Sequence, residues 1–162
     1  KEKDPKNHRI RVPHVIVLDN LQDPGNLGTI FRTAEAAGAT GILLSSDSVD
    51  VYNPKVIRST MGAVFRMPFF YVKDLPAAVK SLSSQGIRTY AAHLNGKNAY
   101  DEEDYTKGCA FLIGNEGNGL RDEVSKCADC LIRIPMCGKA ESLNAAVAAA
   151  VLMFEAGRQR RK

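Results

Sequence analysis

The stretch IPMCGKAESLN, residues 134–144, joins an apolar run to a long alanine-rich segment. Its proline and glycine end the preceding strand, and Ser142 and Asn144 stand where the next helix begins. Two other polar turns, DPGNLG at 23–28 and GNEGNG at 114–119, also follow an apolar run and precede a helical pattern. The three turns together predict one composite polar site.

Apolar runs alternate with helical periodicities on both sides of these turns. The predicted strands cover residues 14–19, 41–45, 69–72, 88–92, 109–113 and 130–134. The predicted helices run from an Asn26 cap to about Ala37, from Pro54 to Thr60, from Leu75 toward Gly86, from Leu120 to Cys127, and through a last segment with Leu143, Val147, Val151 and Phe154 on its apolar face. Residues 95–107 are predicted to form a loop. This order favours an α/β fold with a mostly parallel sheet flanked by helices. The polar turns then follow the carboxyl ends of strands, where helix N-termini bind anions and nucleotides.

The composition is that of one globular domain. The chain has 162 residues, of which 44% are hydrophobic and 25% are charged. Residues 1–12 are predicted to form a basic linker, and residues 13–162 the domain itself. The net charge of +4 comes from basic residues at both ends, which fits attraction to a polyanion and fits a solvated tail equally well. The longest apolar stretch, 145–154, is too short to cross a bilayer, so we expect no membrane association and a cytoplasmic protein.

A dinucleotide-binding fold and a C-x-x-C metal or redox site are disfavoured, and a P-loop is absent. The glycines of 114–119 are spaced G-x-x-G-x-G, unlike the dinucleotide fingerprint. Lys97 and Lys139 follow glycines but lack the serine or threonine of a P-loop. Cys127 and Cys130 form one C-x-x-C, yet no second pair follows and the histidines lack ligand spacing. We expect reduced structural thiols and no metal site.

Single residues in the turns can be interpreted as functional or as structural. Arg32, on the second turn of the first predicted helix, can carry a positive charge toward an anion or simply face solvent. Glu116 can orient an arginine, accept from a ligand or be a polar loop residue. Ser142 taken alone is predicted to be a helix N-cap, whereas Asn144 is more informative because asparagine is a mediocre helix former. The residues alone predict an anion or nucleotide site on an α/β domain.

Three motifs carry a family resemblance. They are N-x-x-D-P-x-N-x-G-x-x-x-R-T-A from Asn20, I-G-N-E-G from Ile113, and I-P-M with S-L-N from Ile134 and Ser142. In order and spacing they closely resemble those of the SpoU/TrmH family of RNA ribose 2′-O-methyltransferases, of the SPOUT class. The resemblance spans residues 13–159 and looks closest to the ribosomal RNA members. It implies an α/β knot in which the C-terminal segment threads through a loop.

The same resemblance implies S-adenosylmethionine as cofactor, RNA as substrate and a homodimer with its sites at the subunit interface. The first and last helices are the expected contact surfaces. The implied cofactor-binding residues are Leu94, Gly114, Asn115, Glu116, Ile134, Met136, Ser142 and Leu143. The implied catalytic residues are Arg32, Asn26, Glu116, Ser142 and Asn144.

The resemblance also implies roles for these catalytic residues. Asn26 and Glu116 would orient Arg32, while Ser142 and Asn144 would position the ribose or the methionyl group. We expect Arg32 to stabilise the developing oxyanion, because a guanidinium group resists deprotonation and is a poor general base.

Other functions remain open. A tRNA ribose 2′-O-methyltransferase shares the motifs, a non-catalytic RNA-binding module shares the fold, and a small-molecule nucleotide enzyme could use the same cleft. Larger family members carry a separate N-terminal RNA-binding domain, and residues 1–12 resemble the remnant of a linker to one.

Overall fold

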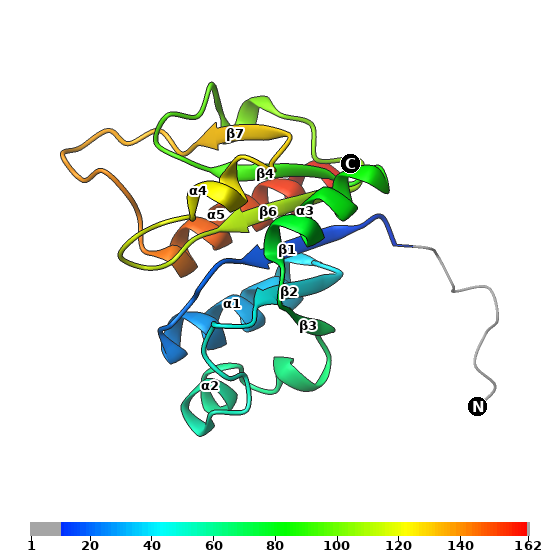
Figure 1. Ribbon diagram of the computed structural model, residues 1–162, viewed down its shortest axis with the longest axis vertical. Coiled ribbons are helices and arrows are strands. Elements are labelled where there is room, and N and C mark those ends of the chain that lie inside the picture. Colours follow the sequence, from blue (N-terminus) through cyan, green and yellow to red (C-terminus); the bar gives the residue numbers. More distant parts are fainter. Residues whose placement is uncertain (1–10, 162) are drawn as a thin grey trace.

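The computed structural model describes residues 11–161, so residues 1–10 of the predicted linker lie outside the described part (Figure 1). Within it, seven parallel strands form one sheet in the order β3-β2-β1-β6-β4-β7-β5. The strands are β1 (His14–Leu18), β2 (Gly41–Ser45), β3 (Phe69–Val72), β4 (Arg88–Ala92), β5 (Asn98–Ala99), β6 (Cys109–Ile113) and β7 (Cys130–Arg133). The predicted α/β class and parallel sheet are confirmed.

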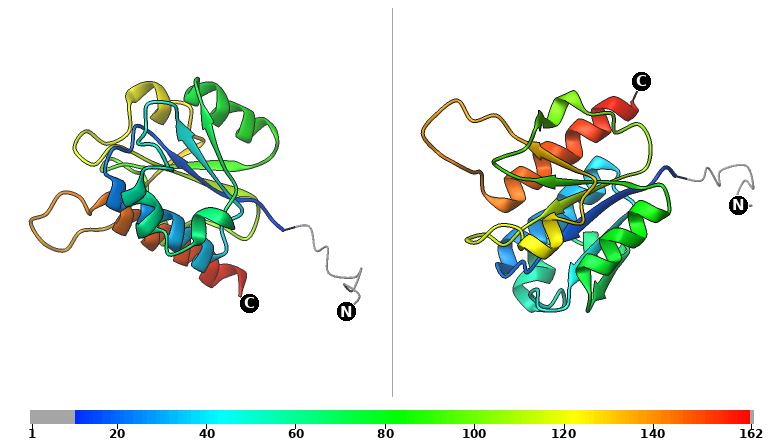
Figure 2. Two further views of the ribbon diagram at one scale, coloured as in Figure 1. Left: turned by 90° about the horizontal axis from the view of Figure 1, so that it is seen from below. Right: turned by 45° about the horizontal axis from the view of Figure 1, so that its top comes forward.

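Helices cover both faces of the sheet (Figure 2). They are α1 (Pro24–Ala37), α2 (Pro54–Ser59), α3 (Leu75–Ser84), α4 (Asp122–Ser125) and α5 (Ala145–Arg160), with 3₁₀ turns η2 (Ala63–Phe65) and η3 (Tyr100–Glu102). The helices α1, α2 and α5 pack on one face, and α3 and α4 on the other. In residues 11–161 no helix is long and apolar enough to cross a membrane.

The central strand β1 shows why two layers form. Ile16 and Leu18 are fully buried in the core shared with α1 and α5. Val17 points the other way, into the smaller core beneath α3 and α4. Alternate residues of a strand face opposite sides, so the consecutive apolar residues 15–18 of β1 require cover on both faces of the sheet.

Two helix caps differ from the predictions. The cap of α1 is Asp23 and not Asn26, because the Asp23 carboxylate accepts from the Asn26 amide at 2.8 Å and Pro24 fits the first turn. The cap of α5 is Asn144 and not Ser142, since Asn144 Oδ1 accepts from the backbone amides of Ala146 and Val147. Each helix is capped by the polar residue that immediately precedes it.

The predicted apolar face of α5 is wrong. Val147 and Phe154 are 49% and 47% exposed, whereas the buried face is made of small residues and two long ones. The buried residues of α5 are Ala146, Ala149, Leu152, Met153 and Ala156. Small residues allow α5 to lie close to α1: a Cβ added at Gly157 would stand 3.3 Å from the Ala37 carbonyl oxygen.

Several predicted boundaries also move. The predicted loop 95–107 contains the short strand β5 and the turn η3, because Asn98 and Ala99 pair with the end of β7. The helix predicted from Leu120 to Cys127 shrinks to α4, and the last strand ends at Arg133 before Ile134 and a proline. None of these changes moves the three polar turns.

Candidate functional site

The three polar turns meet at one edge of the sheet. They follow β1, β6 and β7, which run parallel, so their carboxyl ends lie at the same edge. Figure 1 shows the loops after β6 and β7 projecting from the same side of the molecule. The structure therefore brings together the turns that the sequence predicts to form a composite site.

Glu116 and Asn115 join the second turn to the first. One carboxylate oxygen of Glu116 accepts from the backbone amide of Asp23 at 2.8 Å, and both oxygens accept from the amide of Gln22 at 3.1 and 3.2 Å. Asn115 Nδ2 donates to the carbonyl oxygen of Asn20 at 2.8 Å. The expectation that Glu116 orients Arg32 differs from this geometry, in which the carboxylate is occupied by main-chain amides.

Asn26 and Asn144 join the first turn to the third. Asn144 Nδ2 donates to Asn26 Oδ1 at 3.2 Å, while its Oδ1 caps α5. Arg32 is exposed and lies six residues beyond Asn26, about 120° away around a helix of 3.6 residues per turn. Within one protomer the Asn26 side chain is therefore hydrogen-bonded to Asn144, and its expected role in orienting Arg32 stays a prediction.

Two glycines let backbone segments meet at this edge. A Cβ on Gly114 would lie 2.1 Å from the backbone of Gly119 and Leu120, and a Cβ on Gly96 would lie 2.3 Å from the carbonyl carbon of Ile132. A side chain at Gly114 would open the loop after β6, and one at Gly96 would push the loop after β4 away from β7. Leu94, in the loop after β4, leaves its apolar side chain 63% exposed at the same edge.

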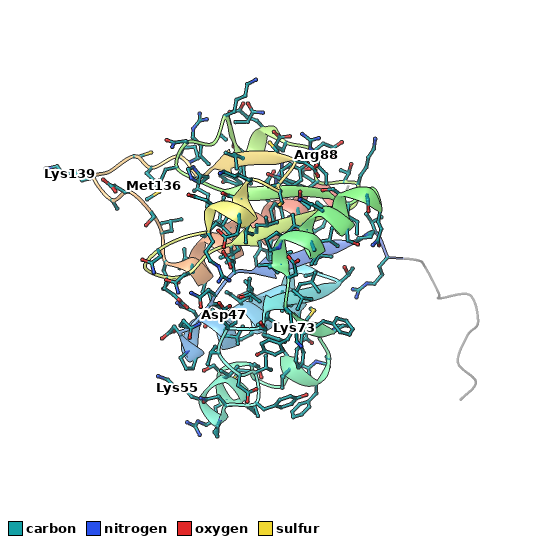
Figure 3. All side chains as sticks on the ribbon, in the orientation of Figure 1. Asp47, Lys55, Lys73, Arg88, Met136 and Lys139 are labelled. Atoms are coloured by element: carbon teal, nitrogen blue, oxygen red, sulfur yellow. The ribbon has the colours of Figure 1, made fainter. Side chains whose placement is uncertain are left out.

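The remaining predicted site residues line the loop from β7 to α5. Ile134 is partly buried and packs on the larger core. Met136 and Leu143 are half-buried, and Ser142 is exposed. Figure 3 shows Met136 and Lys139 on this loop, which extends away from the sheet. The loop thus presents apolar and polar groups beside the other two turns.

A charged network beneath the second turn was missed by the sequence reasoning. Asp19 is fully buried, and its carboxylate accepts from Arg121 at the backbone N (2.8 Å), Nε (2.8 Å) and Nη2 (2.5 Å). Arg121 Nη1 also donates to Asp47 at 2.8 Å. The Ser45 hydroxyl, followed by Arg121, lowers the pKa of Asp47. The available signal was an aspartate ending a buried strand and an arginine closing the glycine-rich turn.

The cysteines lie apart from this edge, with one exception. All four are free: Cys109 is buried, Cys127 and Cys130 are half-buried, and Cys137 is exposed on the loop after β7. Burial raises the pKa of the Cys109 thiol to about 11. In residues 11–161 no group of three or more His, Cys, Asp or Glu side chains could hold a metal ion.

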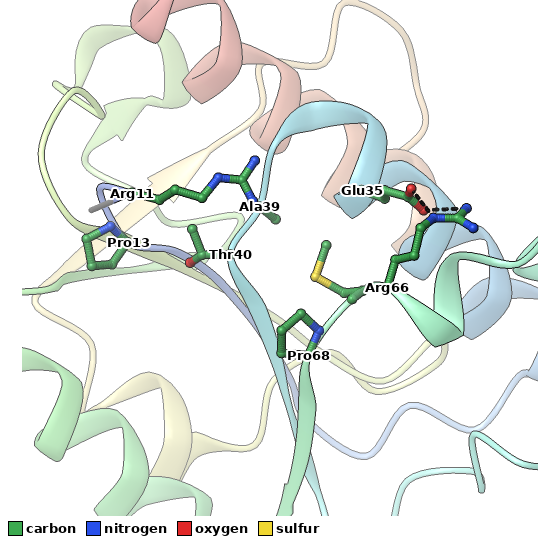
Figure 4. A pocket seen from close by; sticks show the side chains of 8 residues that line it. Arg11, Pro13, Glu35, Ala39, Thr40, Arg66 and Pro68 are labelled. Carbon is green, nitrogen blue, oxygen red and sulfur yellow. Dashed lines mark hydrogen bonds and ion pairs between the residues drawn. The ribbon is translucent and has the colours of Figure 1, made fainter. Parts of the chain in front are cut away.

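A cavity of about 700 Å³ lies at the other edge of the sheet (Figure 4). Pro13, Thr40 and Pro68, which immediately precede β1, β2 and β3, line it together with the Glu35–Arg66 ion pair. These are the amino ends of the strands, opposite the three turns. The cavity is therefore separate from the candidate site.

Comparison with known proteins identifies the family. The model of the SpoU rRNA Methylase family matches residues 13–154. The 23S rRNA (guanosine(2553)-2′-O)-methyltransferase RlmP of Bacillus subtilis is 39% identical over 140 residues, which are 86% of this chain and 56% of that protein.

Solved structures agree. An AdoMet-bound rRNA methyltransferase from Sinorhizobium meliloti is 40% identical with a TM-score of 0.84, covering 90% of this chain and 56% of its own. The SpoU methyltransferase AviRb from Streptomyces viridochromogenes is 33% identical with a TM-score of 0.87, covering 94% of this chain and 62% of its own.

The chain spans about three-fifths of the length of these relatives. The structural neighbours assign it the knotted topology of their fold, as the resemblance implied. With the family model matching most of the domain, and relatives of more than 30% identity covering nearly all of it, the chain belongs to the SpoU rRNA methylase family.

Proposed function

We propose that this chain transfers a methyl group from S-adenosylmethionine to a ribose 2′-hydroxyl of RNA, with ribosomal RNA as the substrate class. One observation carries the proposal: the three family motifs meet at one sheet edge and are tied together by Glu116, Asn115 and the Asn144–Asn26 hydrogen bond. Such an edge, beyond the carboxyl ends of parallel strands, is where ligands bind in α/β folds.

The loops at this edge fit the proposed cofactor. Gly114 and Gly96 let the loop after β6 fold tightly on itself and the loop after β4 lie against β7, which shapes the edge where the cofactor is proposed to bind. Leu94 supplies an exposed apolar surface for a purine ring, and Met136 and Leu143 offer half-buried apolar contacts. Ile134, Ser142, Asn115 and Glu116 complete the proposed set around Gly114. When bound, S-adenosylmethionine supplies an electrophilic methyl group on a sulfonium.

Arg32 is the proposed catalytic residue. When the cofactor supplies its methyl group, the ribose 2′-hydroxyl would have to lose its proton, for which water is the acceptor. Negative charge develops on that oxygen, and a fixed guanidinium nearby stabilises it. Arg32 keeps its own proton throughout, because a guanidinium group is a donor and not a base. Its exposed position on α1 leaves it accessible to an RNA backbone.

The other catalytic candidates act through position. Asn144 and Asn26 hold the beginnings of α5 and α1 together, and the exposed Ser142 stands one turn before α5, where it can meet the ribose or the methionyl group. Glu116 fixes the loop before α1 through two main-chain amides. In this assignment Glu116 shapes the site that Arg32 serves.

A homodimer is part of the proposal. Val147, Val151 and Phe154 repeat at helical spacing on α5, and the first and last of them are about half exposed, so they form an apolar stripe turned away from the core. A partner subunit that covers this stripe would also bring groups from α1 beside the loops of the first protomer. This arrangement would gather Arg32 and the cofactor loops, which one protomer holds apart. Sedimentation equilibrium tests it, with Phe154→Asp expected to give monomers.

Substrate class and location follow from the same proposal. Relatives named for action on 23S rRNA and solved rRNA methyltransferases favour ribosomal RNA. Since that RNA is made and assembled inside the cell, the proposal places the protein in the cytoplasm. A tRNA substrate is the alternative that the assay below separates.

The first test is calorimetric titration of the chain with S-adenosylhomocysteine, which needs no knowledge of the RNA. We expect about one site per protomer. Methyl transfer from tritiated S-adenosylmethionine to unmodified rRNA and tRNA then identifies the substrate. Arg32→Ala should abolish transfer and spare cofactor binding, while Arg88→Ala, an exposed arginine at the opposite sheet edge, should change neither.

The outcomes separate the competing functions. No binding of S-adenosylhomocysteine by a folded dimer would favour the non-catalytic RNA-binding module. Turnover on nucleosides without RNA would favour a small-molecule enzyme. Full transfer by Arg32→Ala would remove Arg32 from the mechanism.

A further inference from the structure

Beside α1, the segment around α2 leaves three large side chains exposed, although the Tyr52 ring also contacts Phe69 edge-on, with 6.1 Å between the ring centroids. Tyr52, Met61 and Phe65 are 65%, 68% and 81% exposed. The same segment contributes Val56 and Ala63 to the core, so its packing is satisfied by other residues. Single exposed apolar residues are normal, but three on one short segment mark a contact surface.

The backbone holds Met61 in an unusual conformation. Met61 has φ 53°, in the left-handed region that non-glycine residues rarely adopt, and Gly62 follows with φ 89°. The turn is fixed by hydrogen bonds from the Ala63 amide to the Thr60 carbonyl and from the Phe65 amide to the Gly62 carbonyl. The fold therefore maintains a strained turn whose consequence is an outward-facing thioether.

Positive charge accompanies these apolar groups. Lys55 and Arg58 are exposed on α2, and neither makes an ion pair within residues 11–161. The nearby Arg66, by contrast, is engaged by Glu35 at 2.5 Å. Figure 3 shows Lys55 extending toward the same side of the molecule as Met136 on the loop after β7.

The surface continues from Arg32. On α1, Gly28, Arg32 and Glu35 share a face, because they are four and three residues apart. A Cβ on Gly28 would lie 2.1 Å from the Ser59 side chain, and Glu35 binds Arg66. The segment from α2 through η2 thus runs along the face of α1 that carries Arg32, and α1 lies between α2 and α5 (Figures 1 and 2).

We infer that Tyr52, Lys55, Arg58, Met61 and Phe65, here named the α2 surface, bind the single-stranded RNA that flanks the methylated nucleotide. The inference rests on the proposed function, because Arg32 defines where that nucleotide sits. Bases stack on exposed aromatic rings while lysine and arginine contact the phosphates, the combination by which proteins hold single strands. An apolar partner protein would not require the two unpaired cations.

The experiment measures the fluorescence anisotropy of a labelled oligouridylate over a range of salt concentrations. The oligonucleotide is about 20 nucleotides long, which exceeds the length that a single-strand-binding domain usually covers. Phe65→Ala should weaken binding at least about fivefold, the loss of one base stack, with the salt dependence unchanged. The double variant Lys55→Ala/Arg58→Ala should make the negative slope of log K against log salt shallower by about 1.4, since each phosphate contact to a single strand contributes about 0.7.

Matched controls lie on the other face of the same region. Phe70 is 66% exposed but alternates with Phe69, which packs against Phe31, so it points to the α3 side of β3. Lys73 is exposed just before α3. Phe70→Ala and Lys73→Ala should bind the oligonucleotide as the parent chain does.

Each result decides the inference. Parent-like binding by both the Phe65 and the Lys55/Arg58 variants would overturn it. A drop in oligomeric mass caused by Phe65→Ala would overturn it in favour of a second copy of the chain covering this surface. Calorimetry with S-adenosylhomocysteine on the same variants separates the two proposals. Variants that lose oligonucleotide binding but keep cofactor binding support the α2 surface. A parent chain that binds the oligonucleotide through the α2 surface but binds no cofactor would refute only the proposed methyl transfer.

Discussion

Arg121→Met tests how the glycine-rich turn after β6 is held. The substitution keeps an unbranched side chain of similar length but removes every guanidinium donor to Asp19 and Asp47. The Asp19 side chain is fully buried. In the variant its carboxylate would keep, of its present hydrogen bonds from residue 121, the one from the backbone amide at 2.8 Å. A buried charge is left with much less compensation.

The size of the effect follows from burial. Removing one partner of a buried ion pair costs about 3–5 kcal/mol. Here the guanidinium is 40% exposed, so it gives up less hydration and water can replace part of its contact with Asp19. The bond to Asp47, itself half exposed, adds less than about 1 kcal/mol. We expect a loss of about 2–3 kcal/mol in the free energy of unfolding.

Urea unfolding of a double-mutant cycle measures this loss. The cycle comprises Arg121→Met, Asp19→Asn and the double variant, which should lose less than the sum of the two because the second change removes the unpaired charge. Arg66→Met is the matched control: its pair with Glu35 is solvent-exposed and should change the unfolding midpoint little. Affinity for S-adenosylhomocysteine should fall with Arg121→Met, since the turn carrying Glu116 loses its anchor.

Two results would refute this reasoning. Unfolding of Arg121→Met at the same urea concentration as Arg66→Met would mean that Asp19 is compensated without the guanidinium. Strict additivity in the cycle would mean that the two side chains are not energetically coupled, whatever their distance.

Three further predictions concern other parts of the molecule. Burial, followed by the charge of Arg160, lowers the pKa of His14 from 6.5 to about 4. As the pH is lowered from 6.5 to 4, the unfolded chain takes up a proton on His14 that the folded chain does not, so the free energy of unfolding falls by about 3 kcal/mol. Urea unfolding of His14→Leu should therefore show a flatter pH dependence over this range. Gly114→Ala should destabilise the fold by about 3 kcal/mol and abolish cofactor binding, whereas Gly117→Ala, whose Cβ meets only a side-chain oxygen at 3.7 Å, should be tolerated in both assays. Asn144→Ala should lose about 1 kcal/mol with its cap; Asn144→Asp should restore stability but, lacking the amide donor to the Asn26 side chain, should not restore methyl transfer.

Much of the fold could be predicted because its strands are buried on both faces. Residues 15–18 and 109–113 are apolar at every position, a pattern typical of strands in a covered parallel sheet. The predicted strand boundaries hold to within a residue for the same reason. The short pairing at β5 could not be predicted, since two residues carry no periodicity and depend on where β7 ends.

The error on α5 has a different physical cause. Large aliphatic residues usually mark the buried face of a helix. On α5 the close approach to α1 near Gly157 and Ala37 admits mainly small side chains, so alanines face inward and Val147 and Phe154 face outward. A long alanine-rich helix carries almost no amphipathic signal, and only its neighbour decides which face is covered.

The location of the composite site could be predicted from the sequence, but most of its side-chain contacts could not. Family motifs brought Asn26, Glu116 and Asn144 to the same edge, but their partners in the structure are main-chain amides and each other. The Asp19–Arg121 pair connects residues 102 positions apart, and nothing local in the sequence couples them. Long-range ion pairs of this kind require the strand order before they can be inferred.

The position of α1 between α5 and α2 connects these observations. Its first turn carries Asn26, which is hydrogen-bonded to Asn144 at the beginning of α5, while the face with Gly28 meets Ser59 of α2. Within the protomer, α1 therefore lies between the loops proposed to bind the cofactor and the α2 surface proposed to bind RNA. Substitutions that disturb α1 packing should impair both regions together, whereas changes at Asn144 or at Phe65 should impair one region each. That separability is the property by which the two proposals can be tested independently.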